Sequence, residues 1–303
     1  MLNKLLLVSR AILFTLLLVI TVIPYAFACM VWSPLPLHWR YKLTMGWPRL
    51  AIWGARVICG VKWQIKGWEN LPNGPAIVLS KHQSAWETLF LPAYLPREVC
   101  FVYKRELHRV PFFGWGLALL AMIPIDRSKG RDAFEQVVKV GQQRLDEGRW
   151  PILFPEGTRI APGKIGRFKM GGALLATRTS APVIPIALNA GECWPRNAFI
   201  KKPGCITVSI GPAIESVGLT PEQLNERVQA WIEAEMQRLN PERYPQQSLA
   251  SLSFCFQMQT HQNLGGPPRL KPFRSVPSGA LSVTVIKRLA LACYAPDGAA
   301  LGL

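Results

Sequence analysis

A long apolar stretch without charge near the N-terminus constrains this chain more than any other feature. From Ala11 to Trp39 there are 29 consecutive residues without Asp, Glu, Lys or Arg. About 20 apolar residues are enough for a helix to cross the hydrocarbon core of a bilayer. A cleaved signal peptide has a shorter apolar region, although Ala26-Phe27-Ala28 resembles a cleavage site and leaves that alternative open. We therefore predict an uncleaved membrane anchor.

The next stretch, Tyr41 to Trp63, is apolar but carries three basic residues spaced seven apart, Lys42, Arg49 and Arg56. On a helix this spacing forms one basic stripe, which is typical of a helix lying in the plane of a membrane interface. The alternative is an ordinary domain helix with a solvated charged edge. Together the two stretches predict an anchor over residues 1–60, which spans the membrane once or dips in and returns.

From Val61 the pattern becomes that of an α/β domain. Short apolar runs between turn residues predict the following strands: Ala76–Ser80, Glu98–Tyr103, Pro151–Phe154, Pro182–Leu188 and Cys205–Ile210. An amphipathic helix is predicted over Arg131–Glu147, with Gly148 after its end. A last helix is predicted to begin after Thr220 and to end at Asn240-Pro241.

This alternation predicts an α/β fold with a mixed, mostly parallel sheet flanked by helices over residues 61–244. Residues 245–303 are rich in Gln, Ser, Pro, Gly and Ala and show no clear period, so we predict a poorly ordered tail there. The seven cysteines are scattered without a C-x-x-C pair. That pattern favours reduced thiols over a disulfide framework or a zinc site.

The charge balance indicates an anionic partner. The chain has a net charge of +17, half of its residues are hydrophobic and only 17% are charged. Nucleic acid, an anionic membrane surface and phosphorylated substrates are all compatible with this balance. The basic residues are spread among strand ends and the anchor rather than gathered in a reader motif, so we do not expect a nucleic-acid partner.

Two constellations directly follow predicted strands, where open α/β sheets usually bind ligands. In the first, Lys81–Glu87, His82 is followed by Glu87, and such a pair can act as a general base with its orienting carboxylate. Taken alone, this pair also fits a purely structural role. The chain has no G-x-S-x-G elbow and no H-E-x-x-H spacing. The nucleophile is therefore expected to be the substrate's own hydroxyl, with no metal site.

The second constellation, Phe154–Arg159, combines a glycine turn with a hydroxyl and a guanidinium. Gly157 lets backbone N–H groups approach an anion, and Thr158 and Arg159 supply donors suited to phosphate. A single basic residue is most often a solvated surface charge. Several of them beside glycine turns favour an anion site instead.

Over residues 60 to 215 the chain resembles the glycerolipid acyltransferases through four blocks in order. His82–Glu87 is similar to the family's H-x4-D block, with Glu in place of the usual Asp. Lys104–Gly116, running on to Asp126-Arg127, is similar to the second block, which is associated with substrate binding. Phe154–Arg159 is similar to the third block, which binds the acceptor's phosphate, and Val183–Leu188 to the fourth, on the acyl side.

The resemblance implies transfer of an acyl group from acyl-CoA or acyl-carrier protein to the hydroxyl of 1-acylglycerol-3-phosphate, without a cofactor. His82 would be the base and Glu87 its partner. The implied substrate-binding residues are Lys104, Arg127, Glu156, Gly157, Thr158 and Arg159. Glycerol-3-phosphate or another lysophospholipid remains an alternative acceptor, and a non-catalytic peripheral lipid-binding protein a different class. We expect a membrane protein, in the inner membrane if bacterial. Because acyl thioesters are cytosolic, we expect its catalytic domain to face the cytoplasm.

Overall fold

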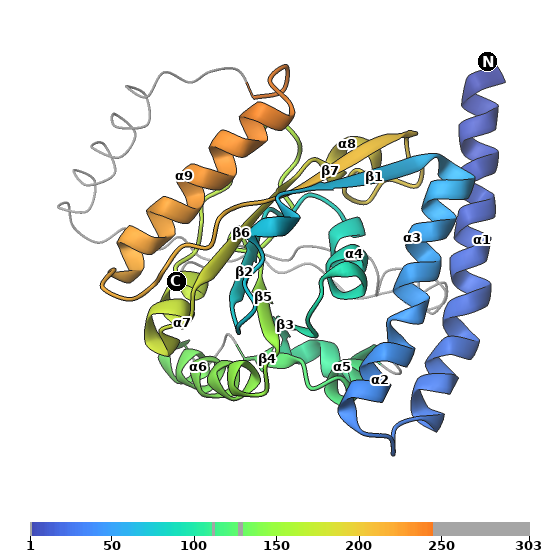
Figure 1. Ribbon diagram of the computed structural model, residues 1–303. Coiled ribbons are helices and arrows are strands. Elements are labelled where there is room, and N and C mark those ends of the chain that lie inside the picture. The colour runs from blue at the N-terminus through green and yellow to red at the C-terminus, as the bar shows by residue number, and fades with distance from the viewer. Residues whose placement is uncertain (1, 111–112, 127–129, 245–303) are drawn as a thin grey trace, which may run out of the picture.

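The computed structural model describes residues 2–110, 113–126 and 130–244, which form a seven-stranded sheet with helices on both faces (Figure 1). The strands are β1 (Val61–Lys66), β2 (Ile77–Ser80), β3 (Val99–Lys104), β4 (Ile123–Ile125), β5 (Trp150–Leu153), β6 (Val183–Leu188) and β7 (Gly204–Ile210). Their order is β1-β7-β6-β2-β5-β3-β4. Every neighbouring pair is parallel except β6 and β7. The predicted mixed, mostly parallel sheet is thus confirmed, while the predicted tail lies outside the described residues.

The central strand β2 is buried on both sides, as its continuous apolar run predicts. Val78 belongs to one hydrophobic core, together with residues of helices α3 (Gly46–Cys59) and α4 (Trp86–Tyr94). Ile77 and Leu79 belong to the other, with α7 (Gly171–Thr179) and α9 (Pro221–Leu239). Alternate side chains of one strand therefore join two cores on opposite faces of the sheet.

The remaining helices are α1 (Leu2–Val31), α2 (Leu37–Thr44), α5 (Phe113–Leu119), α6 (Gly130–Asp146) and α8 (Ala190–Cys193), with the 3-10 helices η1 (Trp68–Asn70) and η2 (Arg105–Arg109). Helix α6 ends before Gly148, which has a φ of 74°, as predicted. Helix α9 begins with the predicted cap, in which Thr220 and Gln223 bond reciprocally. Strands β1 and β4 were not among the predicted strands.

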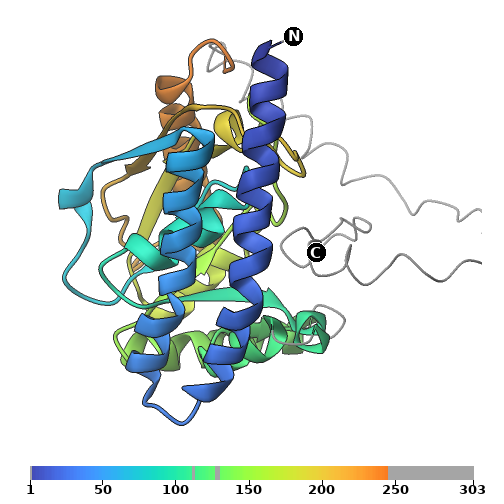
Figure 2. The ribbon, with the colours of Figure 1, turned by 90° about the vertical axis from the view of Figure 1, so that its right-hand side faces the viewer.

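The N-terminal segment is a hairpin along one edge of the protein, with α1 as one arm and α2 and α3 as the other (Figure 2). Helix α1 begins before the uncharged run and includes Lys4 and Arg10. After Val31 the chain reverses, and α2 and α3 run back along α1. Helix α3 ends at Gly60, in a left-handed conformation with φ 73°. The helical stretch expected to reach Trp63 is therefore shorter, and Trp63 lies in β1.

Helix α3 has two different faces. One face is buried in the core shared with the sheet and includes Ile52, Ala55 and Cys59. The other is exposed and carries Arg49, Trp53, Arg56 and Val57, and Lys42 of α2 is exposed as well. The division of the chain at residue 60 stays a prediction, and α3 packs on both α1 and α4.

Candidate active site

The candidate site lies along one edge of the sheet. Strands β6, β2, β5, β3 and β4 are parallel, so their C-terminal ends meet at the same edge. The first sequence block follows β2, the third follows β5, and the second joins the ends of β3 and β4. The fold thus gathers blocks that are far apart in the chain.

His82 is held from four directions. Its backbone N–H donates to Glu156 Oε2 at 3.0 Å, and its carbonyl accepts from Ile160 N at 2.8 Å. Its ring stacks on Phe154 with centroids 3.9 Å apart, and Nδ1 lies 2.9 Å from Glu87 Oε1. Because Glu87 is a carboxylate that accepts from Nδ1–H, the other ring nitrogen, Nε2, is the one able to take a proton. The arrangement fixes both the position and the tautomer of a general base.

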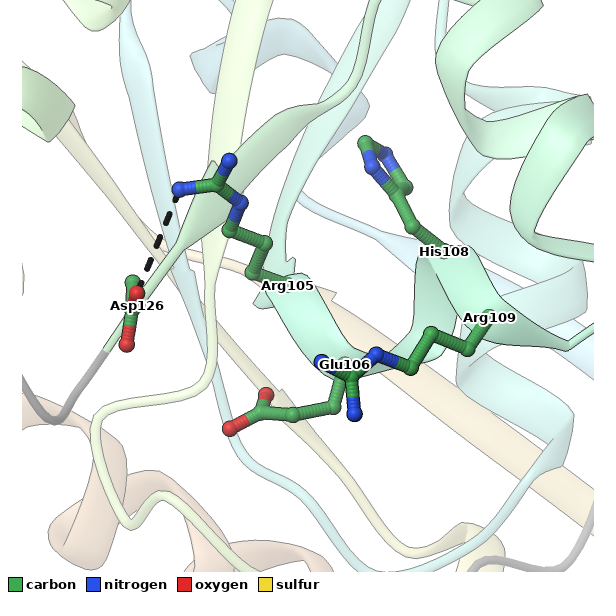
Figure 3. Close-up of a pocket in the computed structure, with 5 residues that line it drawn as sticks. All are labelled: Arg105, Glu106, His108, Arg109 and Asp126. Atoms are coloured by element: carbon green, nitrogen blue, oxygen red, sulfur yellow. Dashed lines mark ion pairs between the residues drawn. The ribbon is translucent and has the colours of Figure 1, made fainter.

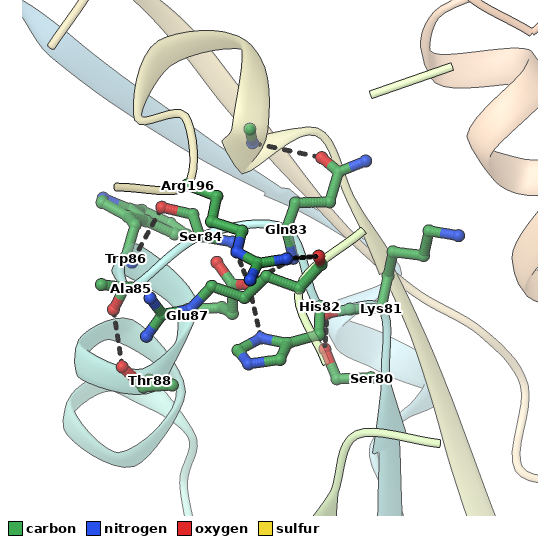
Figure 4. Close-up of polar contacts among 12 residues, drawn as sticks. Ser80, Lys81, His82, Gln83, Ser84, Ala85, Trp86, Glu87, Thr88 and Arg196 are labelled. Carbon is green, nitrogen blue, oxygen red and sulfur yellow. Dashed lines mark hydrogen bonds and ion pairs between the residues drawn. The ribbon is translucent and has the colours of Figure 1, made fainter. Parts of the chain in front are cut away.

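Glu87 shows how a glutamate serves where the family usually has aspartate. It is the second residue of α4, is fully buried, and lies beside His82 and Gln83 (Figure 4). Its Oε1 accepts from the backbone N–H groups of Gln83 and Ser84, both at 2.6 Å, as well as from His82. The extra methylene is accommodated because the carboxylate reaches back over the turn before α4. The same group thus fixes the turn before the helix and orients the histidine.

A buried ionic triad lies behind His82. The Lys81 side chain is completely buried, and its Nζ lies 2.7 Å from Glu156 Oε1 and 2.9 Å from Glu233 Oε1 of α9. The second oxygen of Glu156 accepts the His82 N–H. Lys81 therefore fixes the carboxylate that fixes the backbone of His82. The family resemblance implies that Glu156 binds substrate, whereas its contacts with Lys81 and the His82 N–H favour a positioning role.

The pKa values of Lys81 and Glu156 reflect a balance between burial and pairing. Burial by itself would lower the pKa of the Lys81 ammonium, but Glu156 and Glu233 outweigh burial and raise that pKa above its ordinary value. Burial raises the pKa of the Glu156 carboxyl, while Lys81 and the His82 N–H oppose that rise. Both carboxyl groups lie within 3 Å of the Lys81 ammonium, so the pairing offsets part of the cost of burying the lysine.

The third block forms a tight turn beside the histidine. Gly157 has a φ of 67°, a left-handed conformation that favours glycine, and a Cβ there would lie 3.0 Å from Lys169 Cε. Thr158 and Arg159 follow, both half-buried. Ile160, the next residue, donates its N–H to the His82 carbonyl. The turn expected to bind phosphate is thus tied to the backbone of the candidate base, through the residue that follows Arg159.

The second block lies farther along the same edge. Lys104 ends β3 and is exposed. Next to it is an open cavity of about 530 Å³, lined by Arg105, Glu106, His108, Arg109 and Asp126 (Figure 3). Arg105 and Asp126 form a loose ion pair at 3.9 Å. Arg127, expected to bind substrate, lies outside the described residues.

Three contributors to the site were missed by sequence reasoning. Lys81 was noted only as a neighbour of His82, and Glu233 gave no signal because it lies on a helix 152 positions away. Arg196, in the loop after β6 and α8, donates from Nη1 to the Arg159 carbonyl at 3.2 Å. The rule that strand ends carry function could have indicated it. In the part of the chain that the structure describes, three or more His, Cys, Asp or Glu residues nowhere gather into a metal-binding group.

The chain is similar to known acyltransferases. Residues 62–189 match the family model described as Acyltransferase. The chain is 44% identical over 237 residues to a 1-acyl-sn-glycerol-3-phosphate acyltransferase of Pseudomonas aeruginosa, covering 77% of this chain and 92% of that relative. It is 30% identical over 179 residues to 1-acyl-sn-glycerol-3-phosphate acyltransferase alpha of Mus musculus, covering 58% of this chain and 63% of that relative.

The fold is also similar to a solved structure. The crystal structure of the 1-acyl-sn-glycerophosphate acyltransferase of Thermotoga maritima has a TM-score of 0.63 and 21% sequence identity, covering 79% of this chain and 98% of that one. At that identity the likeness supports the fold alone. The match to the bacterial relative covers nearly the whole length of that relative. The chain belongs to the acyltransferase family that includes the 1-acyl-sn-glycerol-3-phosphate acyltransferases.

Proposed function

We propose that this protein transfers a fatty acyl group from an acyl thioester to the free hydroxyl of 1-acylglycerol-3-phosphate, giving phosphatidic acid. The observation that carries the proposal is the His82–Glu87 pair, bonded through Ile160 to the turn that ends in Arg159. This arrangement supports the proposal because it combines a base with a defined free nitrogen and an adjoining turn that carries an arginine suited to phosphate.

In the proposed reaction the acceptor hydroxyl attacks the thioester carbonyl carbon while His82 Nε2 takes its proton. The new C–O bond forms, the C–S bond breaks as the tetrahedral intermediate collapses, and the imidazolium returns the proton to the leaving thiolate. Glu87 stabilises the imidazolium and Arg159 holds the phosphate. Acyl-CoA and acyl-carrier protein are both acyl thioesters and could each donate the acyl group. The protein supplies the base and the electrostatics without a cofactor.

The function is tested with the full chain in phospholipid vesicles. Thiol release from acyl-CoA and from acyl-carrier protein is followed, and the lipid products are identified by mass spectrometry. The acceptors are 1-acylglycerol-3-phosphate, glycerol-3-phosphate and other lysophospholipids. Phosphatidic acid from the first acceptor supports the proposal. Acyl transfer only to another acceptor, or none at all, refutes it, and lipid binding without thiol release indicates the non-catalytic alternative.

Replacing Arg159 by alanine is expected to raise the KM for the phosphorylated acceptor by about 10- to 100-fold and to leave the KM for the thioester unchanged. The reason is the loss of a charge-assisted contact worth about 1.5–3 kcal/mol. Steady-state kinetics with each substrate varied in turn measures both constants. The control is Arg227→Ala, which removes the same charge from the exposed face of α9. Equal changes in both KM values would contradict the assignment.

We further propose that the N-terminal helices hold the protein at a membrane. Among the described residues, one helix, α1, is long and apolar enough to cross a bilayer, and only 11% of its most hydrophobic window is buried inside the protein. The exposed face of α2 and α3 adds basic residues and Trp53. Exposed apolar surface is unfavourable in water, and basic residues are stabilised near anionic lipid.

The double substitution Lys42→Glu/Arg56→Glu is expected to weaken attachment to anionic vesicles. Each basic residue near such a surface contributes about 1 kcal/mol, so losing and reversing two charges lowers the partition coefficient at least about tenfold. Vesicle flotation at low and high salt, with protein added from a mild detergent, measures this partition coefficient. Lys139→Glu/Arg227→Glu, on the exposed sides of α6 and α9, is the charge-matched control. Equal flotation of both variants would contradict the prediction.

A further inference from the structure

The residues that follow α9 are bonded to the loops of the candidate site. Residues 240–244, which we call the post-α9 segment, contact α8 through Glu192. Asn240 Nδ2 donates to Glu192 Oε1 at 2.9 Å, and Arg243 Nε lies 3.4 Å from the same oxygen. A Cβ on Gly163, in the loop after the third block, would lie 2.8 Å from the Arg243 carbonyl oxygen. The post-α9 segment therefore packs against both α8 and the loop that follows the third block.

Tyr244, the last residue of the post-α9 segment, reaches the first block through its hydroxyl. Its side chain is buried, and the hydroxyl accepts a hydrogen bond from Gln83 Nε2 at 2.9 Å. The amide oxygen of Gln83 accepts from the N–H of Gly191 in α8 at 3.1 Å (Figure 4). Because a backbone N–H can only donate, the Gln83 oxygen faces Gly191 and its NH2 group faces Tyr244. One side chain thus joins the first block, α8 and the post-α9 segment.

Gln83 also belongs to the network that orients the candidate base. It is buried, and its backbone N–H donates to Glu87 Oε1 at 2.6 Å. The same oxygen lies 2.9 Å from His82 Nδ1, so a displacement of Gln83 is expected to move the carboxylate and the imidazole with it. Without the Tyr244 hydroxyl, the buried NH2 group of Gln83 loses its acceptor, which is unfavourable. The Gln83 side chain is then expected to shift toward another acceptor.

We infer that Tyr244 is a positioning residue for acyl transfer, which acts on His82 and Glu87 through Gln83. It lies well beyond residue 189, where the match to the family model ends. A small displacement of a base from its productive position lowers the rate, and a displacement of 1 Å can cost about 100-fold. Because Tyr244 acts through Gln83 rather than on a substrate, its loss should appear in kcat and not in KM. This inference rests on the proposed function, since it concerns the same base.

The experiment compares wild type with Tyr244→Phe, Gln83→Met and the double variant, each as the full chain in vesicles. Tyr244→Phe removes the hydroxyl alone, and Gln83→Met keeps a side chain of similar length without the amide. For each variant, kcat and the KM values for 1-acylglycerol-3-phosphate and for the thioester are measured. Thermal melts give the Tm of each variant, and the kinetics are measured well below the lowest Tm.

The control is Tyr41→Phe, which removes another buried hydroxyl with two hydrogen bonds. That hydroxyl donates to the Pro92 carbonyl at 2.9 Å and accepts from the Val99 N–H at 3.0 Å. Val99 begins β3, so this hydroxyl lies at the opposite edge of the sheet from His82. The control therefore matches the lost hydroxyl and its burial but not its place beside the site.

Tyr244→Phe is expected to lower kcat about tenfold and to change each KM less than about twofold. Gln83→Met should lose at least as much, because it also removes the bond to Gly191. Adding Tyr244→Phe to Gln83→Met should lower kcat no further, since the contact between the two side chains is already gone. Tyr41→Phe should lower the Tm but keep the wild-type kcat.

A wild-type kcat in Tyr244→Phe, a change in one KM alone, or an equal loss of kcat in Tyr41→Phe would overturn the inference. Losses that multiply in the double variant would also overturn it, because the two side chains would then act independently. Wild type that makes no phosphatidic acid refutes the proposed function itself. Active wild type with unaltered kinetics in Tyr244→Phe refutes only the role of Tyr244.

Discussion

Replacing His82 by alanine is expected to lower kcat for acyl transfer by about 10²–10⁴ while the protein remains folded and bound to vesicles. The imidazole is held by Glu87 and Phe154 with Nε2 as the basic nitrogen, so its loss removes the group that takes the hydroxyl proton. The His82 ring is 13% exposed and stacks on Phe154 at the border of one core, so a thermal melt checks that the fold is retained.

The measurement is thiol release under saturating substrates, together with flotation and a thermal melt. His82→Gln is the matched variant, because it keeps a polar side chain of similar reach but cannot act as a base near neutral pH. The two variants should be similarly inactive. Activity within about threefold of wild type in either one would show that another group is the base.

Replacing Lys81 by methionine is expected to destabilise the protein by about 3–5 kcal/mol, because the buried Glu156 and the partly buried Glu233 lose their shared cation. For a chain of this size each kcal/mol lowers Tm by about 2–4 °C, so a fall of about 6–20 °C is expected. Activity measured well below the new Tm should also fall, since Glu156 no longer holds the His82 N–H in place.

A second variant separates charge from shape in this triad. Lys81→Met/Glu156→Gln/Glu233→Gln removes all three charges and is expected to recover much of the Tm, because a neutral buried set avoids the unpaired charges. Lys139→Met, on the exposed side of α6, is the control and should melt like wild type. A single Lys81→Met variant with an unchanged Tm would contradict the buried triad.

The sequence predicted those elements whose local signals agree with their tertiary setting. The buried run of β2 and the capping box of α9 are examples, because burial on both faces and a cap each leave a mark within a few residues. Strand β1 was missed because an apolar helical pattern precedes it and only Gly60 separates the two. Strand β4 was missed because it has three residues and contains Pro124.

The contacts of the candidate site also fall into those that the sequence could predict and those that it could not. His82 and Glu87 are five positions apart, so their contact could be predicted from one turn of chain after a strand. The inward turn of Glu156 could not, because it depends on Lys81 and on Glu233 of a distant helix. Long-range ion pairs leave no periodic mark in a sequence. They become visible only when the sheet brings the strand ends together.

Helix α1 contacts the loop that carries Arg196, and this contact connects the N-terminal helix with the candidate site. Phe14 of α1 meets the Trp194 ring edge-to-face at 5.3 Å and lies 5.9 Å from Lys201 Nζ, so one buried side chain touches both ends of that loop. Transmembrane helices change tilt with the thickness of the lipid around them. If α1 lies in a bilayer as proposed, a change of its tilt is expected to displace Phe14 and the contacting loop together.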